Sequence, residues 1–144
     1  MLYENDVKKA VVAYLKRHGY GKPMMAGLKE HGPDIVAPTP NRRKELWIEA
    51  KGETSSNPRT GRYGKPFDSG QRADHLGKAV LHCMQWMAAN REVLTGIALP
   101  ADGGDVELIE GIKSGLRKLN VVVFLVHQDG RVDTPLGMPR EQRR

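Results

Sequence analysis

Asp34, Glu49 and Lys51 are charged residues within two stretches that otherwise have the pattern of buried strands. Asp34 begins the run PDIVAP, and the other two lie near the end of the run KELWIEAKG. Side chains alternate along a strand, so Glu49 and Lys51 are expected on the same face. If the two runs pair as an antiparallel hairpin through the turn PTPNRR, Asp34 lies beside Glu49. Two carboxylates and one ammonium group would then meet at one place.

Such a group of side chains could perform metal-dependent hydrolysis. Two adjacent carboxylates repel each other, and one takes up a proton unless a cation lies between them. Mg²⁺ or Mn²⁺ suits this position, because a hard divalent cation prefers oxygen ligands, keeps several waters and is completed by a substrate phosphate. A lysine beside it can orient or help to deprotonate a water and offset charge on a phosphoryl group. The structural alternative is an acidic residue at a strand edge and an exposed Glu–Lys ion pair.

The same residues resemble the motif of the PD-(D/E)xK nucleases, a superfamily with the restriction-endonuclease-like fold. Pro33 and Asp34 match the PD, and Glu49, Ala50 and Lys51 match the ExK. By this resemblance Asp34 and Glu49 would bind the metal, and the Ala50 carbonyl could add a ligand. Lys51 would be the catalytic lysine.

The resemblance also suggests a role for one residue on each of the first two predicted helices. Many members place an acidic residue on the first helix, and Glu4 is the candidate because it lies one turn before Val7 on the core-facing side. Some members carry a glutamine at the start of the helix after the ExK strand, where this chain has Gln71. We therefore expect Glu4 to support the metal and Gln71 to position water or substrate.

The elements that must position these residues follow from hydrophobic periodicity and turn residues. The sequence predicts helix 3–18, strands 23–29, 33–38 and 44–52, helix 71–89, strand 93–100, helix 105–119 capped by Asp105, and strand 120–127. The last strand, helix and strand form a crossover unit, so part of the sheet should be parallel. This α-β-β-β-α-β-α-β order resembles a restriction-endonuclease-like core. We thus predict an α/β fold with a central mixed β-sheet flanked by helices.

Basic residues indicate a nucleic-acid partner. The chain has 23 Lys and Arg against 17 Asp and Glu, a net charge of +6, which favours an anionic partner. The long loop 52–70 and the polar face of the second helix are the expected contacts, through phosphate binding and aromatic stacking. The candidates are Arg59, Arg62, Tyr63, Lys65, His75 and Lys78. The alternatives are a loop folded onto the core and a solvated helix face.

Length and composition complete the prediction. The 144 residues suit a single nuclease-like domain, 1–144, with residues 134–144 as a flexible basic tail. No segment has the character of a signal peptide or membrane span, so we expect a cytoplasmic protein without a small-molecule cofactor. A chain this small would need a homodimer or a partner to read sequence. We predict an endonuclease that acts on DNA rather than RNA; the alternatives are a non-catalytic nucleic-acid-binding module and a toxin or defence effector nuclease.

Overall fold

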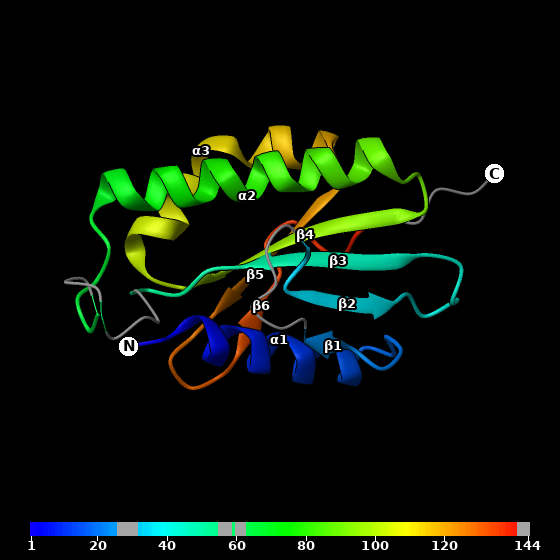
Figure 1. Cartoon of the computed structure of the whole chain (residues 1–144), viewed down its shortest axis with the longest axis horizontal. Coiled ribbons are helices and arrows are strands. Elements are labelled where there is room, and N and C mark those ends of the chain that lie inside the picture. The colour runs from blue at the N-terminus through cyan, green and yellow to red at the C-terminus, as the bar shows by residue number, and fades with distance from the viewer. Residues whose placement is uncertain (26–31, 55–58, 60–62, 141–144) are drawn as a thin grey trace.

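A six-stranded mixed β-sheet with helices on both faces forms the centre of this α/β protein (Figure 1). The computed structural model describes residues 1–25, 32–54, 59 and 63–140. Along the chain it contains α1 (Glu4–Arg17), β1 (Met24–Met25), β2 (Ile35–Pro38), β3 (Glu45–Ala50), α2 (Ser69–Ala89), β4 (Val93–Pro100), α3 (Gly103–Lys118), β5 (Val121–Val126) and β6 (Val132–Asp133). The predicted α/β class and order of elements are confirmed, and β6 is an additional short strand.

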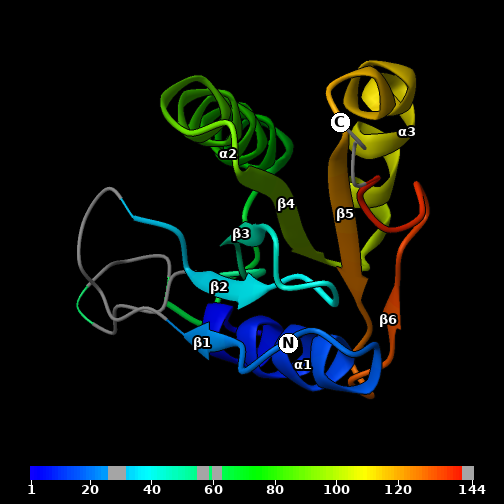
Figure 2. The same ribbon diagram turned by 90° about the vertical axis from the view of Figure 1, so that its right-hand side faces the viewer.

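The sheet combines both strand directions, as predicted. Its strands follow the order β1-β2-β3-β4-β5-β6. Antiparallel pairs join β1, β2 and β3 at one end and β5 to β6 at the other, whereas β3, β4 and β5 run parallel. Every residue of β4 and β5 is buried, because α2 and α3 form the crossovers on one face and α1 covers the other (Figure 2).

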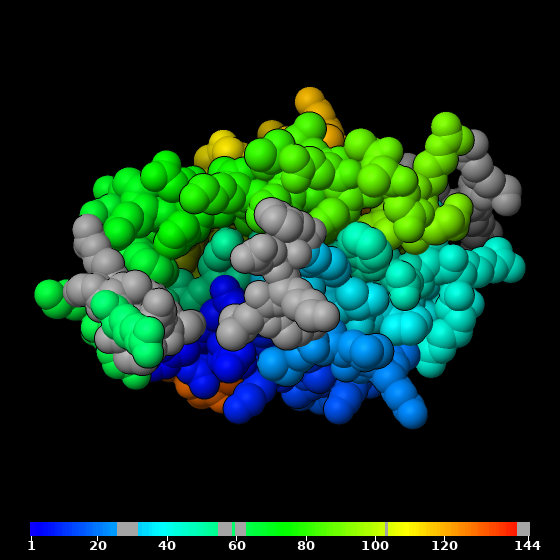
Figure 3. All heavy atoms as spheres, viewed as in Figure 1, coloured from blue at the N-terminus to red at the C-terminus, as the bar shows by residue number. Residues whose placement is uncertain are grey.

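Two apolar cores lie on opposite faces of this sheet. On the α1 face, Val7, Val11 and Leu15 are fully buried against side chains of β2 to β5. On the other face, α2 contributes Cys83 and Trp86 to a core shared with α3. Alternation along β3 therefore sends its even-numbered residues towards α1 and its odd-numbered residues towards α2. Figure 3 shows the β2–β3 hairpin, in cyan, on the surface between these helices.

A close approach at Gly52 brings the start of α1 against the end of β3. A methyl group added to Gly52 would lie 2.6 Å from the backbone nitrogen of Glu4. Nearby, the Glu53 nitrogen donates to the Leu2 carbonyl (2.8 Å), and the Leu2 nitrogen donates to Glu53 Oε2 (2.8 Å). The first turn of α1 is thereby held beside the residues that follow β3.

One predicted helix cap differs in the structure, and the described part of the segment predicted as a tail makes several contacts. The N-cap of α3 is Asp102 and not Asp105, because the Asp102 side chain accepts from the Asp105 nitrogen at 2.9 Å. In the segment predicted as a tail, Thr134 Oγ1 lies 3.4 Å from the Tyr14 hydroxyl. Further along, Asn120 and Arg140 exchange two hydrogen bonds of 2.8 and 2.9 Å. Residues 141–144 lie outside the described part of the chain.

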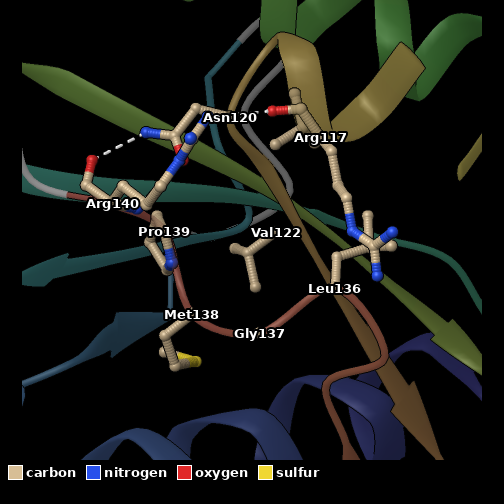
Figure 4. Close-up of a pocket in the computed structure, with 9 residues that line it drawn as sticks. Arg117, Asn120, Val122, Leu136, Gly137, Met138, Pro139 and Arg140 are labelled. Atoms are coloured by element: carbon tan, nitrogen blue, oxygen red, sulfur yellow. Dashed lines mark hydrogen bonds between the residues drawn. The ribbon is translucent and has the colours of Figure 1, made fainter. Parts of the chain in front are cut away.

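This terminal segment encloses a cavity of about 270 Å³ against the end of α3 and the start of β5 (Figure 4). Its lining includes Arg117, Leu136 and Met138. Arg140 Nη2 donates to the Arg117 carbonyl (3.2 Å), so the Arg140 side chain satisfies a carbonyl in the last turn of α3. Among the described helices, none is long and apolar enough to cross a membrane.

Candidate active site

The β2–β3 hairpin places Asp34 beside Glu49. Ile35 pairs with Ile48 in the antiparallel ladder, and the Asp34 nitrogen donates to the Ile48 carbonyl at 2.8 Å. The Asp34 side chain also crosses to the neighbouring strand, where its Oδ2 accepts from the Ala50 nitrogen at 2.7 Å. These bonds hold the first carboxylate at the end of β3, because a charged acceptor strengthens the hydrogen bond to a backbone N–H.

The second contact of Asp34 is a buried lysine on α1. Lys8 is only 3% exposed, and its Nζ lies 3.6 Å from Asp34 Oδ1 and 3.3 Å from Glu4 Oε2. Glu4, expected as a support for the metal, is thus paired with an ammonium group and reaches Asp34 through it. Sequence reasoning missed Lys8, although its i,i+4 spacing from Glu4 is the signal for such a pair.

Glu49 has a different set of partners on the opposite side. It is 6% exposed, its Oε1 lies 3.9 Å from Lys51 Nζ, and its Oε2 forms a short hydrogen bond with His82 Nδ1. Burial raises the pKa of the Glu49 carboxyl, and the hydrogen-bonded Asp34 raises it further, whereas His82 and Lys51 lower it. Sequence reasoning missed the contact between His82 and Glu49.

The two carboxylates share one arrangement. Asp34 Oδ2 is hydrogen-bonded to the Ala50 backbone nitrogen, and Glu49 Oε2 is hydrogen-bonded to His82 Nδ1. The other oxygen of each faces an ammonium group, that of Lys8 or of Lys51. Asp34 Oδ1 and Glu49 Oε1 are therefore the oxygens that already face a positive charge.

This donor set fits a hard divalent cation held by two carboxylates. Mg²⁺ is commonly bound through one or two carboxylates, with waters and substrate phosphates as its other ligands. Within the described ranges, no group of three or more His, Cys, Asp or Glu is arranged to hold a metal ion. Asp34 and Glu49 would thus be the protein ligands, with the Ala50 carbonyl as the further ligand that the family resemblance suggests.

Gln71 caps α2, which differs from the expected role. Its Oε1 accepts from the Asp68 nitrogen at 2.9 Å, and the Gln71 nitrogen donates to Asp68 Oδ1 at 2.9 Å. This reciprocal capping box satisfies backbone donors at the helix start. For the residues described, no hydrogen bond or ion pair joins the Gln71 side chain to Asp34, Glu49 or Lys51, so the water-positioning role finds no support in the geometry.

His75, one helical turn further, lies near Lys51. Both residues line a small hollow that Phe67 also borders, and the rings of Phe67 and His75 meet edge to face with centroids 4.4 Å apart. Burial lowers the pKa of His75, and the positive charges of Lys51 and Lys78 lower it further. Lys78 itself is exposed.

The basic loop is described in part. Arg59 and Lys65 are exposed, and Tyr63 is 47% exposed with its ring centroid 5.8 Å from that of Tyr3. Tyr3 directly precedes α1, so this ring contact places Tyr63 near the start of the helix that carries Lys8. The remaining candidate, Arg62, lies outside the described residues.

A second carboxylate pair borders the same hollow at the start of α3. Asp105 is 5% exposed, and burial, followed by the neighbouring Asp102 carboxyl, raises its pKa to about 7. The Arg72 guanidinium opposes this shift, and its Nη1 donates to the Phe67 carbonyl at 2.8 Å. Sequence reasoning considered Asp105 only as a helix cap.

Comparison with protein families, curated proteins and solved structures finds no match for this chain. The chemistry of the Asp34, Glu49 and Lys51 side chains is therefore the basis for a functional proposal.

Proposed function

We propose that this protein is a metal-dependent nuclease that hydrolyses phosphodiester bonds in DNA, with a restriction-endonuclease-like fold. One observation carries the proposal: the partly buried Asp34 lies beside the buried Glu49, and Lys51 follows on the face of Glu49. The topology supports it, since the hairpin and the following parallel strand bring these residues to one end of the sheet.

The proposed reaction is attack of a water on phosphorus, with cleavage of a P–O bond. Mg²⁺ or Mn²⁺ would supply Lewis acidity and lower the pKa of a bound water. Asp34 Oδ1 and Glu49 Oε1 would hold the ion, because their partner oxygens are already hydrogen-bonded. Lys51 Nζ orients the attacking water and offsets negative charge on the phosphoryl group. The attacking water releases a proton to solvent, and the leaving oxygen takes a proton from solvent.

Surface charge supports a nucleic-acid substrate. The chain carries a net charge of +6, and its exposed basic residues Arg59, Lys65 and Lys78 lie on the loop and helix that follow the site. Cationic side chains of this kind bind phosphates without reading sequence. Tyr63 adds an exposed ring for base stacking. We infer that these residues guide the DNA backbone towards Lys51.

A non-catalytic nucleic-acid-binding module is the second candidate. It is favoured by the ion pairing of the cluster, since Asp34 and Glu49 each have a lysine partner that offsets their charge. A toxin or defence effector nuclease would use the same chemistry in another biological setting.

Cleavage assays separate these functions. Supercoiled plasmid, branched DNA and RNA are incubated with the wild type and with Lys51→Ala, in Mg²⁺, Mn²⁺ or EDTA. The nuclease predicts DNA cleavage that requires the metal and is lost in Lys51→Ala. Cleavage that persists in EDTA, or equally in Lys51→Ala, would refute the assigned site. Salt-dependent binding without cleavage of any substrate would favour the binding module.

A further inference from the structure

Lys8 is a buried cation between two acidic residues of the candidate site. Its side chain is 4% exposed, and its Nζ lies 3.3 Å from Glu4 and 3.6 Å from Asp34. Burial of an ammonium group is costly unless it is paired, and the Glu4 and Asp34 carboxylates offset this cost for Lys8. Both distances exceed those of a tight charge-assisted hydrogen bond, about 2.7–2.9 Å. The ammonium group therefore lies between the two carboxylates.

Lys8 faces the oxygen that the proposed metal would need. The other oxygen of Asp34, Oδ2, is held by the Ala50 nitrogen, so Oδ1 is the oxygen that remains for a cation. An ion bound there would lie close to the ammonium group and be repelled by it. This repulsion is weakly screened, because Lys8 is removed from solvent.

The balance of charge indicates when a metal can bind. When all five groups are charged, the carboxylates of Glu4, Asp34 and Glu49 face the two ammonium groups of Lys8 and Lys51. One net negative charge remains, which is a weak attraction for a divalent ion. A phosphodiester at the site would add a second negative charge and would itself be a ligand.

We propose that Lys8 is a resident counter-ion that makes binding of the divalent metal depend on the phosphate of the substrate. This inference rests on the proposed function, because it concerns the same metal site. Without nucleic acid, Lys8 neutralises Asp34 and keeps the affinity for metal low. With nucleic acid bound, the added phosphate charge compensates for Lys8, so metal and substrate each strengthen the binding of the other, as linkage requires.

The test measures Mn²⁺ binding and needs no turnover. Free Mn²⁺ is followed by electron paramagnetic resonance, with and without a short phosphorothioate DNA duplex that resists cleavage. The wild type should bind Mn²⁺ at least about fivefold more tightly with the duplex present. Lys8→Gln, which keeps an amide donor but removes the charge, should bind Mn²⁺ alone about tenfold more tightly than the wild type and gain less from the duplex.

Lys9→Gln is the matched control, because it removes the same charge from the next position of α1, where the side chain is exposed. It should retain the metal affinity of the wild type. Thermal unfolding gives a second readout: Lys8→Gln should unfold at a lower temperature than the wild type in EDTA and be stabilised more by Mn²⁺.

Three results would overturn the inference, and they differ in what they say about the proposed nuclease. Equal Mn²⁺ affinity in the wild type and Lys8→Gln, with or without duplex, would leave the metal site intact and remove the role of Lys8. If Lys9→Gln gained as much Mn²⁺ affinity as Lys8→Gln, the change in net charge would explain the gain without any role for the position of Lys8. Absence of Mn²⁺ binding in every protein, with duplex present, would refute the metal site and the proposed function together.

Discussion

Two pairs of neighbouring carboxyl groups, Asp34 with Glu49 and Asp102 with Asp105, are stabilised in different ways. Asp34 and Glu49 each face a lysine and a fixed nitrogen. Asp102 is the N-cap of α3 and Asp105 lies in its first turn, where the pKa of Asp105 rises to about 7 because of burial and because of its neighbour. Ammonium groups face both members of the first pair, whereas the second pair has the Arg72 guanidinium beside it and a pKa of about 7 at Asp105.

This difference shows that proximity of two carboxylates does not by itself indicate a metal site. The second pair serves a helix end, since Asp102 accepts from the Asp105 nitrogen and its charge is favoured at a helix N-terminus. The first pair caps no helix and lies beside Lys51, a residue suited to phosphoryl chemistry. Substitutions in the two pairs should therefore have different consequences.

Removing the charge of Asp34 should have the largest effect. Asp34→Asn keeps an oxygen that can accept from the Ala50 nitrogen, so the fold should persist while a proposed metal ligand is lost. We expect kcat/KM for DNA cleavage to fall by about 10³-fold. Asp102→Asn is the matched substitution in the second pair and should stay within about threefold of wild type, because asparagine is an equally good N-cap. Comparable losses in the two variants would contradict the distinction.

Gly52→Ala should break the first site through the backbone. The added methyl would lie 2.6 Å from the Glu4 nitrogen, so the start of α1 would have to move. We expect a loss of about 1–3 kcal/mol in the free energy of unfolding, measured in urea. Gly77→Ala is the control, because a methyl there meets nothing within 4 Å and lies in a helix, so it should stabilise by about 0.5–1 kcal/mol. If both substitutions destabilised the protein, the close approach of Gly52 to Glu4 would not explain the effect of Gly52→Ala.

His82 tests how Glu49 is held. Groups that hydrogen-bond to metal ligands typically contribute 10–100-fold to activity or metal affinity, so His82→Leu should lower cleavage by about that factor. His82→Asn should recover part of the loss, since its amide can donate from a position near that of Nδ1. Gln85→Leu, at an exposed position of the same helix, should have no effect. Equal activity of the leucine and asparagine variants at 82 would exclude the hydrogen bond as the reason.

The last prediction concerns how the stability of the protein depends on pH through Asp105. The folded pKa of Asp105, about 7, lies above its ordinary value of 3.8, so the folded protein holds a proton that the unfolded chain releases. Stability should therefore fall as pH rises from about 4 to 7. Asp105→Asn should remove this fall and be more stable than wild type at pH 8. Urea unfolding at pH 5 and 8 measures it; an unchanged pH dependence would contradict the raised pKa.

Local patterns were sufficient to predict the hairpin of the candidate site. Alternation along residues 44–52 and the turn at 39–43 determine which strands pair, and pairing then puts Asp34 next to Glu49. The order of helices and strands was also predictable, because long apolar periods are strong signals. The two-residue strand β6 was not, since its pairing depends on β5 and on no pattern of its own.

Contacts between distant elements could not be predicted. Lys8 is buried only because the hairpin brings Asp34 to α1, and His82 reaches Glu49 only because α2 crosses the sheet above β3. For Gln71, by contrast, the local sequence contained a signal that would have predicted its contact. Its spacing from Asp68 is that of a capping box, which explains its position without any catalytic role.

The most direct measurement of the central claim is the Mn²⁺-induced change in unfolding temperature of variants in the two pairs. Asp34→Asn combined with Glu49→Gln is compared with Asp102→Asn combined with Asp105→Asn and with the wild type, all in the presence of the phosphorothioate duplex. We predict that Mn²⁺ stabilises the wild type and the Asp102–Asp105 variant equally and leaves the Asp34–Glu49 variant unchanged. Equal stabilisation of all three proteins, or a loss confined to the Asp102–Asp105 variant, would contradict the assignment of the metal site.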